Sequence, residues 1–397
     1  MLPRDYYLNK LIQYKDTEFI KVITGVRRSG KSVLLKLFQS HLVDEGFADS
    51  VFFINFEHPD TFKLHNTEVL FDYIKENVTK DKKIYFLFDE IQEVTGWPKL
   101  INGLRVAYDC DIYITGSTAN LLSGELATYL TGRYVEIPIY PLSFSEFLIF
   151  TNTRDLKEEQ SALNEYLKFG GFPSVVLLRE PLLKTDVLKG IYNSILLKDV
   201  SIHGNISNID LLLKISIYLM DNIGNPISSN RIANYLSSAG TKTKADTIDK
   251  YLLLLENAFI FYKAVRYDVR GKERLKTLGK YYVVDTGLRN NVLGRINTDL
   301  GSQIENLVFM KLLQSGYEVF VGKYDAYEID FVCFKNEVVK YVQVVYELPK
   351  QSDRETKNLL LIRDNYEKLI VSMNYFDVGF IDGIEIVHLF DFLQRDE

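Results

Sequence analysis

Eight consecutive residues near the N-terminus, Gly25 to Ser32, have the types and spacing of a phosphate-binding loop. They read Gly-Val-Arg-Arg-Ser-Gly-Lys-Ser and match the P-loop pattern G-x-x-x-x-G-K-[ST] at every fixed position. Gly25 and Gly30 permit backbone angles that a side chain would forbid, so successive N–H groups can surround phosphate oxygens. Lys31 can place an ammonium between the β- and γ-phosphates, and the Ser32 hydroxyl can coordinate Mg²⁺. The sequence therefore predicts an ATP and Mg²⁺ site formed by Gly25, Val26, Arg27, Arg28, Ser29, Gly30, Lys31, Ser32 and Val33.

Two carboxylates, Asp89 and Glu90, directly follow the apolar run Ile84–Phe88. Such a run predicts a buried strand, and open α/β sheets bind ligands in the crevice at the carboxyl ends of their strands. We expect Asp89 to hold Mg²⁺, directly or through a water. Glu90 is predicted to polarise the water that attacks the γ-phosphate. The pair is also common at solvated strand ends, but its position after the strand favours a hydrolytic site.

A third group of polar residues follows the predicted strand Asp111–Thr115, in the segment Gly116-Ser117-Thr118-Ala119-Asn120. A small polar side chain here can contact both the γ-phosphate and the attacking water. We predict Ser117 in this role, with Thr115 and Asn120 as alternatives. A turn rich in Ser and Asn that has no catalytic role is the structural alternative.

The first 150 residues alternate apolar runs with helical patterns. This alternation predicts an α/β fold, with a parallel sheet that is covered by helices on both faces. We expect a P-loop ATPase domain at 1–150. Its predicted strands are 19–24, 51–56, 84–88, 111–115 and 134–139, and its first predicted helices are 6–14 and 31–42.

The middle of the chain predicts two further parts. Residues 151–207 are expected to form a helical linker or lid, with a sharp break at Gly170-Gly171-Phe172-Pro173. Residues 208–295 combine three helical segments with two strands, predicted at 258–267 and 275–284. Three helices followed by a β-hairpin is the order of a winged helix.

Positive charge is concentrated in this middle region. Residues 201–290 contain 13 Lys/Arg and 8 Asp/Glu, although the whole chain has a net charge of −6. Thr243 is predicted to cap the third helix, and a recognition helix with a basic wing suits duplex DNA. Contact with a protein partner, or a lid role, is the alternative. The basic residues of the hairpin are Lys263, Arg266, Arg270, Lys272, Arg274, Lys276 and Lys280.

Composition and length set broad limits on the protein. The chain has 397 residues, of which 47% are hydrophobic and 25% charged, as in ordinary globular proteins with more than one domain. No apolar run approaches the roughly 18 residues that a membrane-spanning helix needs. The N-terminal residues lack an apolar export segment, so we expect a cytoplasmic protein without membrane contact.

Several motifs together resemble a known family. They include the run Ile114–Arg133, the segment Pro141–Phe147, the Gly170–Pro173 break, and Asp285-Thr286-Gly287-Leu288. In combination they resemble the prokaryotic AAA+ ATPases called AAA_14, which carry a C-terminal DUF4143 region. The resemblance implies that Arg133 is an arginine finger. Such a finger acts on the nucleotide of a neighbouring subunit and accelerates hydrolysis about 10³–10⁵-fold, so the resemblance also implies a homo-oligomer.

The last part, 296–397, reads as a small α/β domain whose order resembles the restriction-endonuclease-like fold. Glu305 lies on a predicted helix and Asp330 opens a strand. An active nuclease of this kind needs a carboxylate and then a lysine, two residues later, on the next strand. Gln343 and Val345 occupy those positions. We therefore expect a degenerate domain that does not cleave DNA.

Three functions remain open at this point. The first is an AAA+ ATPase that couples hydrolysis to movement of the winged helix and the degenerate domain, with duplex DNA as a candidate partner. The second is a slow ATP-dependent switch that recruits a protein. The third is an ATP-controlled nuclease.

Overall fold

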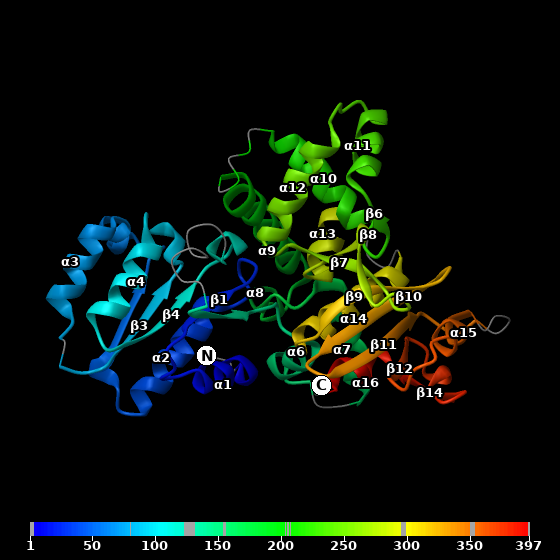
Figure 1. The fold of residues 1–397 in the computed structure, drawn as a ribbon, viewed down its shortest axis with the longest axis horizontal. Helices are drawn as coiled ribbons and strands as arrows, with labels where there is room; N and C mark the ends of the chain where they lie inside the picture. Colours follow the sequence, from blue (N-terminus) through cyan, green and yellow to red (C-terminus); the bar gives the residue numbers. More distant parts are fainter. Residues whose placement is uncertain are drawn as a thin grey trace. The chain divides into compact units, whose positions relative to one another are not determined.

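The computed structural model describes residues 4–79, 81–122, 132–153, 156–202, 204, 206, 208–294, 299–349 and 354–395 (Figure 1). The chain divides into two compact units. The first comprises Met1–Tyr140 with Asn257–Phe259, and the second comprises Pro141–Glu256 with Ile260–Glu397.

The first unit is built on a five-stranded sheet in the order β2-β3-β4-β1-β5, in which all neighbouring strands are parallel. This arrangement confirms the predicted α/β fold with a parallel sheet. The strands are β1 (Ile20–Thr24), β2 (Val51–Asn55), β3 (Ile84–Asp89), β4 (Cys110–Thr115) and β5 (Tyr134–Pro138). The helices of this unit are α1 (Asp5–Gln13), α2 (Lys31–Asp44), α3 (Thr67–Asn77) and α4 (Trp97–Ala107).

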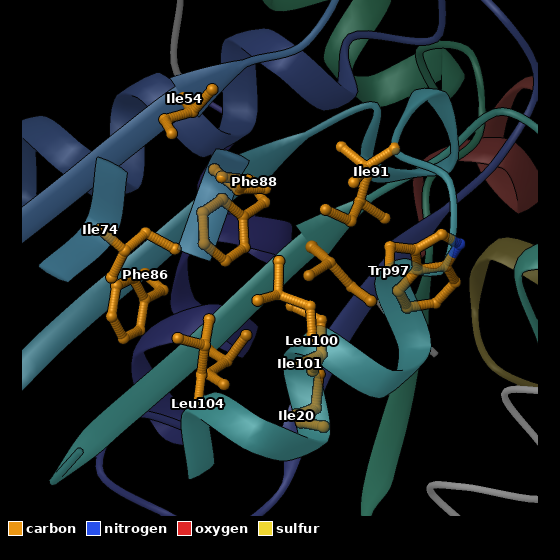
Figure 2. Packing of buried hydrophobic residues seen from close by; sticks show 14 of the residues in the cluster. Ile20, Ile54, Ile74, Phe86, Phe88, Ile91, Trp97, Leu100, Ile101 and Leu104 are labelled. Atoms are coloured by element: carbon orange, nitrogen blue, oxygen red, sulfur yellow. The ribbon is translucent and has the colours of Figure 1, made fainter. Parts of the chain in front are cut away.

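Both faces of this sheet are covered by helices. Because side chains alternate along each strand, one strand contributes residues to the hydrophobic clusters on both faces. On β3, Phe86 and Phe88 join a hydrophobic cluster that includes residues of α3 and α4 (Figure 2). Tyr85 and Leu87 join a second cluster with residues of α1 and α2. The internal strand β3 is therefore continuously apolar, and its first charged residue, Asp89, is the residue at which the strand ends.

The second unit contains a nine-stranded mixed sheet in the order β13-β14-β12-β11-β10-β9-β7-β8-β6. The hairpin of β7 and β8 lies in the same sheet as the C-terminal strands, because β7 pairs in parallel with β9. The strands are β6 (Pro226–Ile227), β7 (Phe261–Asp268), β8 (Glu273–Val283), β9 (Glu318–Tyr324), β10 (Tyr327–Lys335), β11 (Val338–Val345), β12 (Glu367–Ser372), β13 (Gly379–Ile381) and β14 (Ile384–His388).

Helices occupy most of the rest of the second unit. A π-helical segment at Ile195–Ile202 follows α9. The order α14-β9-β10-β11-α15-β12 contains the predicted C-terminal helix and strands. The helices are α6 (Phe144–Thr151), α7 (Leu156–Phe169), α8 (Pro173–Val176), α9 (Pro181–Ser194), α10 (Ile209–Asp221), α11 (Ser229–Ser238), α12 (Ala245–Asn257), α13 (Thr286–Leu293), α14 (Leu300–Gln314), α15 (Arg354–Leu360) and α16 (Leu389–Gln394).

The break at Gly170-Gly171 packs directly against Asp285. One carboxylate oxygen of Asp285 accepts the Gly171 N–H at 2.7 Å, and the other accepts the Leu288 N–H at 2.9 Å and caps α13. Gly170 has φ +74°, and a Cβ there would collide with the carboxylate. Two motifs that are far apart in the sequence therefore form one buried joint, which explains the glycines without any catalytic role.

This joint makes a pH-dependent contribution to stability. Burial raises the pKa of Asp285 to about 6, although N–H donors from Gly171, Leu288 and Gly287 act to lower it. The folded state therefore holds this proton more tightly than the unfolded state, so ionisation of Asp285 reduces stability as the pH rises from about 4 to about 6. Relative to Asp285→Asn, we expect the wild-type free energy of unfolding to fall by about 2 kcal/mol between pH 4 and pH 7.

Urea unfolding at a series of pH values measures this difference. Asp382→Asn, at an exposed turn, is the matched control and should retain the wild-type pH dependence. Parallel curves for the wild type and Asp285→Asn would contradict the assignment.

Candidate nucleotide-binding site

The predicted phosphate-binding loop connects the end of β1 to the start of α2. Gly25 has φ +141°, and a Cβ at this position would collide with the carbonyl oxygen of Ile139, so only glycine fits. Gly30 has φ +103° and is the residue immediately before α2. The positive end of the α2 dipole and its free N–H groups therefore face the loop, as an anion-binding site requires.

The polar groups of the loop fit a polyphosphate. The Nζ of Lys31 donates to the carbonyl oxygens of Gly25 at 2.9 Å and Val26 at 3.1 Å. The Ser29 hydroxyl oxygen is buried without a hydrogen-bond partner. Buried polar groups normally have partners, so this orphaned hydroxyl is one observation that favours a ligand here.

Arg4, near the N-terminus, contacts the phosphate-binding loop through its guanidinium group. Its Nη1 donates to the carbonyl oxygen of Ser29 at 2.8 Å and to that of Tyr140 at 3.0 Å. The guanidinium also lies 4.5 Å from the centre of the Tyr7 ring and is almost fully buried. The sequence analysis does not predict this role, because a single arginine distant from the motif has no distinctive spacing.

The proposed metal ligands lie together at the carboxyl edge of the sheet. One oxygen of Asp89 accepts from the Ser32 hydroxyl at 3.0 Å and from the Thr115 hydroxyl at 2.7 Å. The other accepts from the side-chain amide of Asn55 at 2.8 Å. Burial raises the pKa of Asp89, while the hydrogen bonds from Thr115 and Ser32 lower it.

This donor set suits Mg²⁺ bound together with phosphate. Within the described ranges, no group of three or more His, Cys, Asp or Glu side chains forms a metal cage. Mg²⁺ does not need such a cage, because it commonly binds through one or two protein oxygens together with phosphates and waters. Ser32 and Asp89 can supply those protein oxygens.

Glu90 has an unusual backbone conformation next to Lys31. Its φ of 57° and ψ of 52° are left-handed, which is uncommon for residues other than glycine and is often found at functional sites. One carboxylate oxygen lies 4.0 Å from the Nζ of Lys31, and the other accepts a short hydrogen bond from Gln92. Burial raises the pKa of Glu90, and the positive charges of Lys31 and Arg27 offset part of this rise.

Thr115 connects the two carboxylate residues. Its hydroxyl donates to Asp89 and accepts the Glu90 backbone N–H at 2.9 Å. Ser117, our first choice for this position, is also buried, whereas the Asn120 side chain lies outside the described part of the structure. The contacts of Thr115, one of the two alternatives, support a positioning role for it, and Ser117 stays a prediction.

Thr115→Val tests this assignment because valine has nearly the same shape but cannot form either hydrogen bond. The Glu90 N–H would be left buried without an acceptor, which costs about 1–3 kcal/mol. We expect ATP turnover to fall roughly 10- to 100-fold with little change in ATP affinity, measured by phosphate release and calorimetry. Ser117→Ala is the comparison variant. A larger loss in Ser117→Ala than in Thr115→Val would restore Ser117 as the key residue.

Sequence reasoning missed Asn55 and Gln92 as well as Arg4. Asn55 ends β2, whose last residue is paired in register with Asp89 at the end of β3. The rule that selected Asp89, a polar residue at the carboxyl end of a buried strand, could have selected Asn55 as well. Gln92 follows the Asp-Glu pair in a short 3₁₀ turn and has no comparable signal.

The structure does not bring Arg133 to the site within one chain. Arg133 is exposed and immediately precedes β5, and its carbonyl oxygen accepts the N–H of Ile20, the first residue of β1. Since β5 and β1 are parallel, Arg133 lies at the amino edge of the sheet, opposite the phosphate-binding loop. The preceding motif residues, 123–131, lie outside the described residues.

The candidate nuclease residues in the second unit do come together, around a lysine from another strand. The Nζ of Lys280 lies 3.0 Å from Glu305 and from Glu328, and 4.0 Å from Asp330. Burial raises the pKa of Asp330 well above its ordinary value. Gln343 donates to Glu355 at 2.7 Å. Val345 occupies the position on β11 at which an active nuclease carries its lysine, so this position cannot supply the cation.

This arrangement corrects the picture of a basic hairpin that is free to meet phosphates. Lys280 is buried among carboxylates, Arg270 pairs with Asp325 at 2.9 Å, and Arg274 pairs with Glu318 at 2.7 Å. The two arginine pairs are exposed and therefore weak, but they reduce the net positive charge. The predicted cap at Thr243 is also wrong, because its buried hydroxyl has no hydrogen-bond partner.

Comparison with known proteins agrees with the first unit. A family model described as an AAA domain, AAA_14, matches residues 17–148. The fold is also similar to the Walker-type ATPase PABY2304 of Pyrococcus abyssi, with a TM-score of 0.53 and 16% identity, covering 74% of this chain and 96% of that one. The fold and the phosphate-binding loop define a P-loop ATPase domain of the AAA type.

The chain belongs to a family shared by bacteria and archaea. An uncharacterized protein of Haemophilus influenzae is 48% identical over 402 residues, covering 100% of this chain and 99% of the relative. The uncharacterized protein MJ1544 of Methanocaldococcus jannaschii is 34% identical over 381 residues, covering 91% of this chain and 83% of the relative.

The second unit matches a different model from the one we expect. Residues 160–299 match DUF8612, a domain of unknown function, in place of the DUF4143 region implied by the resemblance. Among the helices of the described residues, none is both long and apolar enough to span a membrane.

Proposed function

We propose that this protein binds ATP with Mg²⁺ at Gly25–Val33 and hydrolyses it to ADP and phosphate. The observation that carries this proposal is the convergence of Lys31, Ser32, Asp89 and Glu90 at one edge of the parallel sheet. These four residues supply a cation, a hydroxyl and two carboxylates within a network of 2.7–4.0 Å contacts.

Each residue has a definite task in this reaction. Lys31 exchanges the carbonyl oxygens of Gly25 and Val26 for phosphate oxygens and stabilises their growing negative charge. Ser32 and Asp89 hold Mg²⁺, which when bound neutralises charge on the β- and γ-phosphates. Glu90 orients the attacking water and accepts its proton. Thr115 fixes the positions of both carboxylate residues.

Arg133 can take part only from another copy of the chain. Its exposed position at the amino edge of the sheet supports a role in trans, at the γ-phosphate of a neighbouring subunit. We propose that the active form is a homo-oligomer in which Arg133 completes each site. An arginine that arrives only at assembly would make hydrolysis depend on oligomer formation.

The second unit is proposed to receive the movement that hydrolysis produces. Its α10, α11, α12 and hairpin have the order of a winged helix, and α14-β9-β10-β11-α15-β12 has the order of a restriction-endonuclease-like domain. Because Gln343 and Val345 replace the residues that cleavage needs, we propose binding without cleavage. Duplex DNA is the favoured partner because Lys242 and Lys244, just before α12, and Lys250, within α12, are exposed. A protein partner is the alternative.

One experiment tests this proposal. Phosphate release from ATP and Mg²⁺ is measured with and without duplex DNA, and the particle mass is measured with ATP present. DNA-stimulated turnover and an ATP-dependent rise in mass support the complete proposal. Turnover below about one per minute that DNA does not change favours the slow switch. Absence of any ATP binding overturns the proposal.

A further inference from the structure

A cavity of about 660 Å³ lies beside the turn that joins β7 to β8, entirely within the second unit. Its volume is within the range of cavities that hold small organic ligands. It lies beside the sheet rather than at the Lys280 carboxylate cluster. Its lining includes the aromatic residues Tyr324, Phe334, Tyr341 and Tyr366 and the basic residues Lys272 and Arg363.

Five aromatic residues, Tyr267, Tyr324, Phe334, Tyr341 and Tyr366, contribute to the lining. Tyr341 is buried, and its hydroxyl donates to Asp364 at 2.8 Å, which fixes the ring. Tyr366 stands beside it, with the two ring centres 6.4 Å apart, and its side chain is 46% exposed. Within the described residues, no hydrogen bond engages the Tyr366 hydroxyl, and about half of this residue remains exposed beside Tyr341. A flat aromatic ligand can stack on it.

The charge at the rim favours an anion. Arg363 and Lys272 are exposed and form no ion pair or hydrogen bond through their side chains within the described structure. Asp364, the carboxylate in the lining, accepts from Tyr341 and pairs with Lys368, and Asp325 pairs with Arg270. Asp268, next to the lining, accepts the backbone N–H groups of Arg270 and Gly271. Among the described residues that line the cavity, the charges without an ion-pair partner are therefore those of Lys272 and Arg363.

We propose that this cavity binds one unpaired nucleotide unit. The base stacks on Tyr366, and its phosphate contacts Arg363 and Lys272. Stacking of this kind does not depend on the identity of the base, because every base has a flat face. Unpaired bases are available in single-stranded nucleic acid and in free nucleotides, and both sources share this chemistry. The inference does not depend on ATP hydrolysis in the first unit.

Fluorescence anisotropy with a labelled twelve-residue oligothymidylate tests the proposal. The full-length chain carries Lys31→Ala, so that the phosphate-binding loop does not compete for the probe. We expect Tyr366→Ala to raise the Kd about tenfold and Tyr366→Phe to leave it within about twofold. Arg363→Ala should raise the Kd severalfold. It should also reduce the slope of log Kd against log salt concentration by about one, the change expected for the loss of one phosphate contact.

Matched controls separate this site from general charge and aromatic content. Tyr346→Ala removes a tyrosine of similar exposure outside the cavity, and Arg179→Ala removes an exposed arginine elsewhere. Both should bind the probe as the parent chain does.

Competition identifies the source of the nucleotide. Displacement of the probe by thymidine monophosphate at an equal concentration of nucleotide would show that the cavity takes free nucleotides. Failure of the monophosphate to displace it, with effective displacement by unlabelled oligothymidylate, would assign single-stranded nucleic acid. The proposal is overturned if neither ligand binds, if a duplex competes equally well, or if Tyr366→Ala and Arg363→Ala leave the Kd unchanged.

Discussion

Lys31→Ala is expected to abolish ATP hydrolysis and to raise the Kd for ATP about a hundredfold. The Nζ of Lys31 donates to the carbonyl oxygens of Gly25 and Val26 inside the loop, and it lies 4.0 Å from Glu90. Hydrogen bonds to charged groups contribute about 1.5–3 kcal/mol each, and a hundredfold change corresponds to about 2.7 kcal/mol. Loss of turnover exceeds loss of binding, because charge on the γ-phosphate oxygens grows in the transition state.

Calorimetry with ATP and Mg²⁺ measures the binding, and phosphate release measures turnover. Lys36→Ala, an exposed lysine further along α2, is the control and should behave as the wild type. If the wild type and Lys31→Ala bind ATP equally well, the loop does not have the role that its sequence predicts.

Glu90→Gln is expected to retain ATP binding and to lose turnover by a factor of about 10²–10⁴. Glutamine preserves the size of the side chain but cannot accept a proton from water. The left-handed backbone of Glu90 and the bond from its N–H to Thr115 do not depend on the carboxylate, so the local structure should persist. Removal of a buried carboxylate near Asp89 also removes repulsion of the phosphates, which favours retained or tighter binding.

Single-turnover phosphate release separates this effect from slow product release. Glu76→Gln, an exposed glutamate of α3, provides the matched control. Hydrolysis at the wild-type rate in Glu90→Gln would show that another group activates the water.

The sequence predicts the parts of the nucleotide site that are contiguous in the chain. Gly25 to Ser32 form one loop, so the requirements of the phosphate are visible in their spacing. Asp89 and Glu90 are found because they directly follow the buried apolar run Ile84–Phe88, at the carboxyl edge where open α/β sheets bind ligands. The contacts of Asn55 and Thr115 with Asp89 depend on the strand order β2-β3-β4-β1-β5, which no local pattern contains.

The charges of the hairpin show what the sequence alone does not predict, namely which basic residues are paired. The sequence shows Arg270, Arg274 and Lys280 as one basic group. Their carboxylate partners, such as Glu305 and Asp325, are 25 and 55 residues away along the chain. Because pairing across a sheet is set by register, a local excess of lysine and arginine does not reveal how much charge remains free.

The pairing of β7 with β9 makes the hairpin and the C-terminal strands inseparable. Arg266, Tyr267 and Asp268 align with Val321, Gly322 and Lys323 in a parallel register. In a shortened chain that ended at residue 295, β7 would stay paired with β8, but its backbone groups that face β9 would lose their partners and form an open edge that invites association with other chains. We therefore expect the middle and last parts of this protein to fold together, and neither part to fold as an independent domain.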